Sequence, residues 1–143
     1  MTRIDFYVLD NHDDKAQAQL TCRLADKACT KQHQVYIHTN TRQDSEQLDQ
    51  YMWIYPDGSF LPHCLYSAEE SGSTPVVIGH DHEPENATDV LINLADEVPP
   101  FYSRFERIVE LVTGDELTRQ KARERYKYYR DRGYAIDTHK LSG

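Results

Sequence analysis

The sequence predicts one α/β domain, spanning residues 1–143, in which a mainly parallel central sheet is flanked by helices. Two observations predict this fold class. Short segments rich in β-branched and aromatic residues alternate with longer segments of helical periodicity, and strands that are separated by helices usually pair in parallel. The length of 143 residues and the hydrophobic fraction of 38% suit one compact core rather than two.

The first half of the chain contains two predicted strands, each followed by a predicted helix. "RIDFYVL" (3–9) and "QVYIHT" (34–39) are apolar and rich in β-branched and aromatic residues, as strands are. Apolar residues at helical spacing predict a helix over about 14–32 and an amphipathic helix over 44–53. The turn residues "PDG" (56–58) follow the second helix.

Three short apolar segments come next, at 60–65, 75–80 and 89–94, and polar stretches separate them. Their length and content favour short strands of the same sheet. The segment 66–74 is rich in Ser, Glu and Gly and has almost nothing to bury. We therefore expect it to be a surface loop.

Two helices are predicted in the last third. Pro99 and Pro100 suit the start of the first, and Gly114 suits its end. The second runs from Asp115 to Arg132, with acids at its start and bases at its end as the helix dipole favours, and Gly133 follows as a C-terminal cap. The apolar stripe of the first helix consists of Phe101, Phe105, Ile108, Val109 and Val112.

The sequence lacks the motifs of a nucleotide-using enzyme. It contains neither G-x-G-x-x-G nor G-x-x-x-x-G-K-[ST], and the turn after the first strand, "LDNHDD" (9–14), carries carboxylates that would repel a phosphate. "HDHE" (80–83) offers two histidines beside acids, but no third ligand at a recognisable spacing. We therefore predict no catalytic residue, no cofactor and no metal, and we interpret 80–83 as a solvated loop.

The cysteines and the apolar runs indicate the compartment. Cys22, Cys29 and Cys64 are odd in number and match neither a redox pair nor a zinc site, so we expect reduced thiols and small core residues. No run approaches the ~20 apolar residues of a membrane span, and the first residues do not form a signal peptide. These features predict a cytoplasmic protein without a membrane segment.

One segment, 115–133, differs in charge from the rest of the chain. It carries a net charge of +3, whereas the other residues together carry −11, which gives the chain its net charge of −8. A helical wheel places Arg119, Arg123, Tyr126 and Arg130 on one stripe, with Lys127 at its edge. Four acids accompany the seven basic residues of the segment, which are Arg119, Lys121, Arg123, Arg125, Lys127, Arg130 and Arg132.

Three explanations of this basic helix face remain. A solvated helix with ion pairs along its length is the ordinary one. Nucleic acid could bind guanidinium groups and stack on tyrosine, but the −11 elsewhere would repel an extended polyanion. A short acidic peptide fits within the face, and its carboxylates can accept paired hydrogen bonds from arginine.

Three blocks of the sequence carry a resemblance to a known family. "FYVLDN", "YMWIYPDGSFLPHCL" and "QKARERYKYYRDRGYAIDT" resemble, in order and spacing, the chi subunit of bacterial DNA polymerase III. The resemblance covers residues 4 to about 138, and the polar region 66–88 is its divergent part. It implies a non-enzymatic clamp-loader accessory subunit whose fold is similar to mononucleotide-binding domains. Its implied partners are the psi subunit and the acidic C-terminal tail of single-stranded DNA-binding protein, which ends in Ile-Pro-Phe, with no sequence-specific binding of nucleic acid.

The resemblance also implies the residues of a tail-binding site. Arg123 matches the position that holds the terminal carboxylate of the tail, and Arg119 and Lys127 match bases that meet its aspartates. Arg119 departs from the lysine that is common there. Val112, Tyr126 and Thr138 match positions around the phenylalanine of the tail. Ordinary packing at element ends is an equally good explanation of Val112 and Thr138.

A second set of implied residues concerns the psi subunit. We expect its interface at Phe60, Leu61 and Pro62, with Trp53 closing the preceding helix. Burial in the core is the favoured interpretation of Trp53, because a lone tryptophan is usually well buried. The resemblance also implies a repair helicase as a competitor for this surface, although no residue indicates one.

Overall fold

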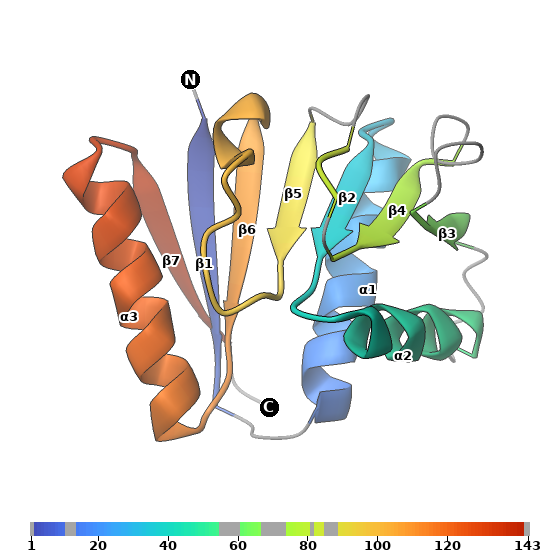
Figure 1. Ribbon diagram of the computed structural model, residues 1–143, viewed down its shortest axis with the longest axis horizontal. Helices are drawn as coiled ribbons and strands as arrows, with labels where there is room; N and C mark the ends of the chain where they lie inside the picture. Colours follow the sequence, from blue (N-terminus) through green and yellow to red (C-terminus); the bar gives the residue numbers. More distant parts are fainter. Residues whose placement is uncertain are drawn as a thin grey trace.

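A computed structural model describes residues 2–10, 14–54, 61–66, 74–80, 82–84 and 89–141 of the chain. In these residues all seven strands are parallel and form one sheet in the order β3-β4-β2-β5-β6-β1-β7 (Figure 1). The strands are β1 (Arg3–Leu9), β2 (Val35–His38), β3 (His63–Leu65), β4 (Val76–Gly79), β5 (Val90–Asn93), β6 (Arg107–Val112) and β7 (Ile136–Leu141). The helices are α1 (Asp14–Thr30), α2 (Arg42–Trp53), α3 (Glu116–Asp131) and the short 3-10 helix η1 (Tyr102–Arg104). The predicted α/β fold with a parallel sheet is confirmed.

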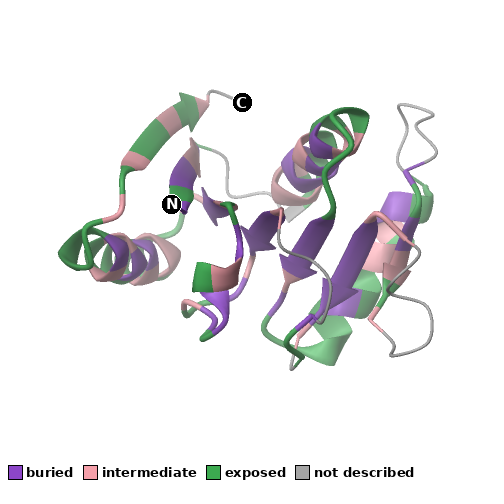
Figure 2. Cartoon of the chain, turned by 90° about the horizontal axis from the view of Figure 1, so that it is seen from above, coloured by how far each residue is buried: buried purple, intermediate pink, exposed green. Residues whose placement is uncertain are grey.

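Helices cover both faces of the sheet and make three layers. On one face, α1 and α2 contribute Leu20, Ala25 and Leu48 to a core with β2, β4 and β5. On the other face, α3 and the segment around η1 contribute Ala122 and Tyr129 to a second core. Figure 2 shows the buried strands between these layers, with exposed residues on the outer sides of the helices. The layer of α1 and α2 and the layer of α3 thus lie on opposite faces of the sheet.

The helix predicted between Pro99 and Gly114 is wrong. Residues 102–104 form only the single turn of η1, and 107–112 form β6, which lies between β5 and β1. The apolar residues there fit a helical period, but a run of buried residues is also what a strand covered on both faces requires. β6 is buried along nearly its whole length. Burial on both faces of the sheet therefore explains why this apolar segment is a strand and not a helix.

The last helix is confirmed, and an unpredicted strand follows it. The Asp115 side chain accepts a hydrogen bond from Thr118 N (2.9 Å) and caps α3 at its start. Gly133 has φ +84°, the left-handed conformation that favours glycine after a helix. β7 then pairs with β1 at the edge of the sheet, and its mixed polar sequence is typical of an edge strand.

The short strand expected at 75–80, inside the polar region 66–88, is confirmed. Residues 76–79 form β4, a fully buried strand that pairs with β2 and β3. The predicted surface loop at 66–74 lies mainly outside the described residues, as do Phe60 and the turn at 56–58. Among the helices of the described residues, none combines the length and apolar character that crossing a membrane requires.

Candidate functional site

The basic helix α3 is fixed to the sheet by a buried polar network centred on Glu110. Arg125 Nε donates to Glu110 Oε1 (2.9 Å), and Tyr129 Oη donates to Glu110 Oε2 (2.6 Å). Asn93 Nδ2 donates to the same carboxylate at 3.0 Å. Burial raises the pKa of Glu110, although the Arg125 charge and these hydrogen bonds oppose it. Arg125 is therefore an internal residue, and its charge does not contribute to the surface of α3.

The exposed side of α3 presents three basic residues at intervals of four. Arg123 is 64% exposed, and its Nη2 lies 3.0 Å from Glu116 Oε1. Arg119 is half-buried and donates from Nε to Gly114 O at 3.2 Å. Lys127 is exposed and, within the described part of the chain, has no carboxylate partner. Lys121 points elsewhere, because it pairs with Asp96 at 3.0 Å.

Of the other three predicted tail residues, Tyr126 is on α3, and Val112 and Thr138 are on the strands β6 and β7. Tyr126 is half-buried, and its ring centroid lies 5.3 Å from that of Phe6. Two residues of β1 connect these positions. Phe6 is in register with Thr138 on β7, and Val8 is in register with Val112 on β6. Thr138 is exposed, whereas Val112 is buried at 6%. The fold thus gathers the six predicted positions around α3 and the adjacent edge of the sheet.

Sequence reasoning missed one residue of this surface, Phe6. Phe6 forms its floor beneath Tyr126, and the alternation of β1, which places Phe6 on the same face as Ile4, was the signal for it. Leu117, in the first turn of α3, is 61% exposed, but helical spacing places it on the side of Lys121, away from Arg119 and Tyr126. Its exposure could not be read from the sequence.

A second surface lies at the end of α2. Trp53 is 71% exposed and Ile54 is 76% exposed, so the favoured prediction that Trp53 belongs to the core is wrong. The Trp53 ring packs on that of His63, with centroids 4.7 Å apart. Pro62 is exposed, but Leu61 is only 8% exposed and packs in the α1–α2 core. Trp53 and Ile54 therefore supply the apolar surface here, and Leu61 supports it from below.

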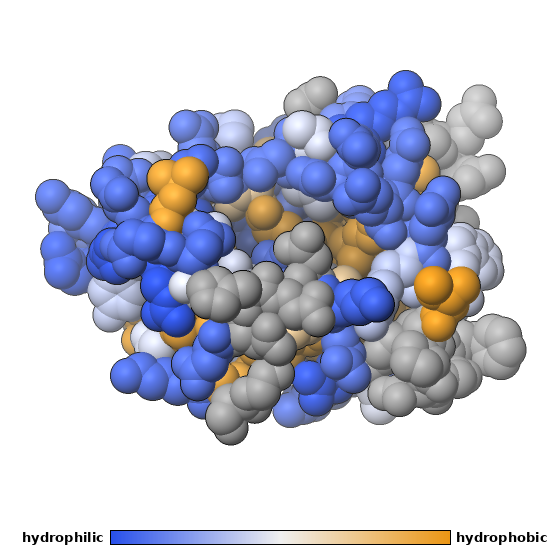
Figure 3. Space-filling view, turned by 90° about the horizontal axis from the view of Figure 1, so that it is seen from below, coloured by the Kyte–Doolittle hydropathy of each residue, from blue (hydrophilic) through white to orange (hydrophobic). Residues whose placement is uncertain are grey.

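The carboxyl edge of the sheet, where open parallel sheets often bind nucleotides, is acidic in this protein. Its cavity of about 450 Å³ is lined by Asp44, Asp96 and Asp115, and two of these acids lie at the starts of α2 and α3. Figure 3 views this edge from below and shows a mainly hydrophilic surface with few exposed apolar patches. Carboxylates at helix N-termini occupy the place that a phosphate would take.

Two further sets of chemical groups are the histidines that follow β4 and the cysteines of α1. His80 and His82 are in ring contact, at 5.8 Å, and His82 also stacks on Tyr66. Among the described residues, no group of three or more His, Cys, Asp or Glu side chains could hold a metal ion. Burial raises the pKa of the Cys22 thiol to about 12 and that of Cys29 to about 11, so both are protonated at neutral pH.

The fold defines the class of protein first: a three-layer α/β protein with a parallel sheet, a basic helix on one face and an apolar helix end on the other. Comparison with known proteins then identifies the family. The family model of the DNA polymerase III chi subunit, HolC, matches residues 1–137, and the chain belongs to this family.

Two relatives show the extent of the similarity. The DNA polymerase III subunit chi of Pseudomonas aeruginosa is 41% identical over 141 residues, which cover 99% of this chain and 98% of the relative. The subunit chi of Escherichia coli K12 is 32% identical over 143 residues, which cover 96% and 97%. The similarity therefore extends over nearly the whole domain, and the resemblance seen in the sequence is confirmed.

Proposed function

We propose that the chain is a non-catalytic, cytoplasmic adapter of DNA polymerase III. It binds the psi subunit of the clamp loader at one surface and the acidic C-terminal tail of single-stranded DNA-binding protein at another. Membership of the chi family supports the assignment to DNA polymerase III. The basic face of α3 and the apolar end of α2 lie on opposite faces of the sheet. A partner bound at one of these surfaces leaves the other surface accessible, which supports a linking role.

The observation that carries the tail proposal is the basic face of α3 on an otherwise acidic molecule. Arg119, Arg123 and Lys127 lie at helical spacing next to Tyr126, whose ring packs on that of Phe6, so charged and apolar contacts are available together. In our proposal Arg123 holds the terminal carboxylate and the other two bases meet the aspartates. The phenylalanine of the tail packs near Tyr126, Val112 and Thr138.

The psi proposal depends on the end of α2. The exposed side chains of Trp53 and Ile54 are the apolar contacts expected at the centre of a protein interface. Pro62 is exposed beside them, and Phe60 enters the proposal through the family resemblance alone. The same resemblance implies a repair helicase as a competitor for this surface.

Calorimetry with a free acidic peptide ending in Ile-Pro-Phe tests the tail site. We expect Arg123→Ala to weaken peptide binding by about 1–3 kcal/mol, because it removes a charge-assisted hydrogen bond. The matched control is Lys121→Ala, which removes one charge from the same helix at a position paired with Asp96. Equal losses in both variants, or unchanged affinity in Arg123→Ala with an intact circular dichroism spectrum, would reject the site.

A further inference from the structure

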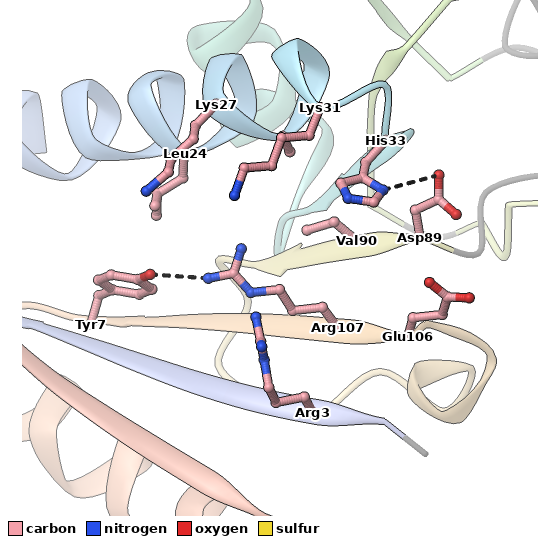
Figure 4. A pocket seen from close by; sticks show the side chains of 11 residues that line it. Arg3, Tyr7, Leu24, Lys27, Lys31, His33, Asp89, Val90, Glu106 and Arg107 are labelled. Carbon is pink, nitrogen blue, oxygen red and sulfur yellow. Dashed lines mark hydrogen bonds and ion pairs between the residues drawn. The ribbon is translucent and has the colours of Figure 1, made fainter.

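A basic pocket lies on the face of the sheet opposite α3. Its cavity of about 530 Å³ is bounded by the C-terminal part of α1 and by the amino ends of β1, β5 and β6. Figure 4 shows Lys27 of α1 and Lys31, just after that helix, above the sheet, and Arg3 and Arg107 projecting from the strands below them. Four basic side chains thus approach one cavity.

The arginine at the base of the pocket is held in place. Arg107 Nε donates to Asp5 Oδ2 (2.8 Å), and Arg107 Nη2 donates to Tyr7 Oη (3.0 Å). Arg3 Nε lies 3.6 Å from the same carboxylate, which is 4% exposed. One buried carboxylate therefore serves two guanidinium groups, and the base of the pocket keeps an excess of positive charge.

The lysines above it add to this excess. Lys27 is in the last turn of α1 and Lys31 directly follows the helix, and both line the pocket, where their like charges repel. Within the described residues neither has an ion pair. The dipole of α1 favours bases near its C-terminal end, which explains lysines there but not two arginines facing them. An anion between the helix and the sheet would relieve this repulsion.

The other end of the pocket is acidic. Asp89 and Glu106 line it, and His33 Nδ1 lies 4.0 Å from Asp89 Oδ2. Asp89 Oδ2 also accepts a hydrogen bond from Gln34 N at 2.8 Å. Figure 4 shows these carboxylates at the end away from Lys27 and Tyr7. Ionised carboxylates only accept hydrogen bonds, so this end suits hydroxyl or amino groups.

We propose that this pocket binds a small phosphorylated ligand of the nucleotide class. Its phosphates contact Lys27, Lys31, Arg3 and Arg107, and its sugar hydroxyls donate to Asp89 and Glu106. The site lies at the amino ends of the strands, away from the acidic carboxyl edge. A long nucleic acid strand is a poor occupant, because the chain carries a net charge of −8 and would repel phosphates beyond the pocket. This site goes beyond the proposed adapter function, which it does not require.

Titration of the full chain at low salt, followed by calorimetry, tests the proposal with three probes: a nucleoside 5′-diphosphate, inorganic pyrophosphate and the nucleoside alone. We expect saturable binding of the diphosphate with one site per chain, weaker binding of pyrophosphate, and none of the nucleoside. The double variant Lys27→Ala/Lys31→Ala should weaken diphosphate binding by roughly tenfold or more. The matched control is Arg23→Ala/Lys140→Ala, which removes two exposed charges outside the pocket and should leave the affinity unchanged.

Four results would overturn the proposal. These are the absence of saturable diphosphate binding, an equal loss of affinity in the control, and a full affinity in the double variant with a native circular dichroism spectrum. The fourth is a single-stranded oligonucleotide that binds through Lys27 and Lys31 and that excess diphosphate does not displace, since the occupant would then be a nucleic acid strand. Tail-peptide affinity is measured in the same variants and should not change, which separates this site from that on α3.

Discussion

Arg123 is already paired in the free protein, which gives the tail site a built-in competitor. Its Nη2 lies 3.0 Å from Glu116 Oε1, and both side chains are largely exposed, at 64% and 80%. An exposed pair of this kind contributes little to stability, so a ligand carboxylate can replace Glu116 at small cost. Glu116 nevertheless repels an acidic ligand from the start of α3.

We therefore predict that Glu116→Gln strengthens binding of the acidic tail peptide. The gain should be about 0.5–1 kcal/mol in calorimetry at low salt, because the substitution frees Arg123 and removes a like charge. The gain should shrink at high salt, where exposed charges are screened. If Glu116→Gln weakens binding, or if the gain is independent of salt, Arg123 is not the residue that meets the ligand carboxylate.

At the scale of single residues, the sequence predicts which basic residues share a helix face better than it predicts which residues are buried. The basic positions Arg119, Arg123 and Lys127 follow from helical spacing, and the fold places all three around α3. The usual burial of tryptophan predicts that Trp53 belongs to the core, yet it is 71% exposed. Whether a residue is buried depends on which element packs against it, and local sequence does not contain that information.

At the scale of elements, α3 is positioned by a contact that the sequence could not reveal. Glu110 on β6 and Arg125 on α3 are 15 residues apart and fully or nearly buried, with side chains 0% and 6% exposed. The helix expected over 99–114 rests on the spacing of its apolar residues, and nothing in that spacing indicates that Glu110 pairs with Arg125. Burial of a paired carboxylate within a strand requires a helix above it, which is a feature of the tertiary fold.

We predict that Glu110→Ala destabilises the domain by about 3–5 kcal/mol, because it leaves the Arg125 guanidinium buried without a counter-charge. Urea unfolding followed by circular dichroism measures the change. The double variant Glu110→Leu/Arg125→Met should recover much of the loss, since neither charge is then buried. A single variant as stable as the parent would mean that Arg125 turns outward and that α3 is held by its apolar contacts alone.

β1 is joined to both neighbouring strands by Asp5. Its carboxylate accepts from Arg107 of β6 at 2.8 Å and lies 3.0 Å from His139 Nε2 of β7. Burial raises the pKa of Asp5, but hydrogen bonds from Arg107 and His139 and the charges of Arg107 and Arg3 outweigh it, so the pKa lies below its ordinary value.

This lowered pKa predicts how stability depends on pH. Since the folded-state pKa of Asp5 is below its unfolded value of about 3.9, the ionised carboxylate stabilises the native state above that pH. The contribution is lost as the pH falls through the folded-state pKa. We expect Asp5→Asn to lower stability at neutral pH by about 1–3 kcal/mol and to flatten the acid limb of the stability curve. An acid limb identical to that of the parent would contradict the role of Asp5.

At the scale of the whole molecule, the basic side of α3 and the exposed apolar end of α2 lie on different faces of the sheet. The basic side of α3 lies on one face of the sheet, whereas α1 and α2 lie on the other (Figure 1). The charge difference between 115–133 and the rest of the chain was visible in the sequence, and so was the α/β class. The strand order could not be predicted, because it depends on which strands pair in the folded sheet, and neighbouring strands there are often not consecutive in the sequence.

The central claim, that one chain links two partners, is tested most directly by a bridging assay. The acidic tail peptide is immobilised, the intact chain and the psi subunit are added, and retained psi is quantified. We predict that psi is retained only when the chain is present, that Arg123→Ala loses both proteins, and that Trp53→Ala retains the chain but loses psi. Retention of psi without the chain, or an inability of the unsubstituted chain to hold peptide and psi together, would contradict the account.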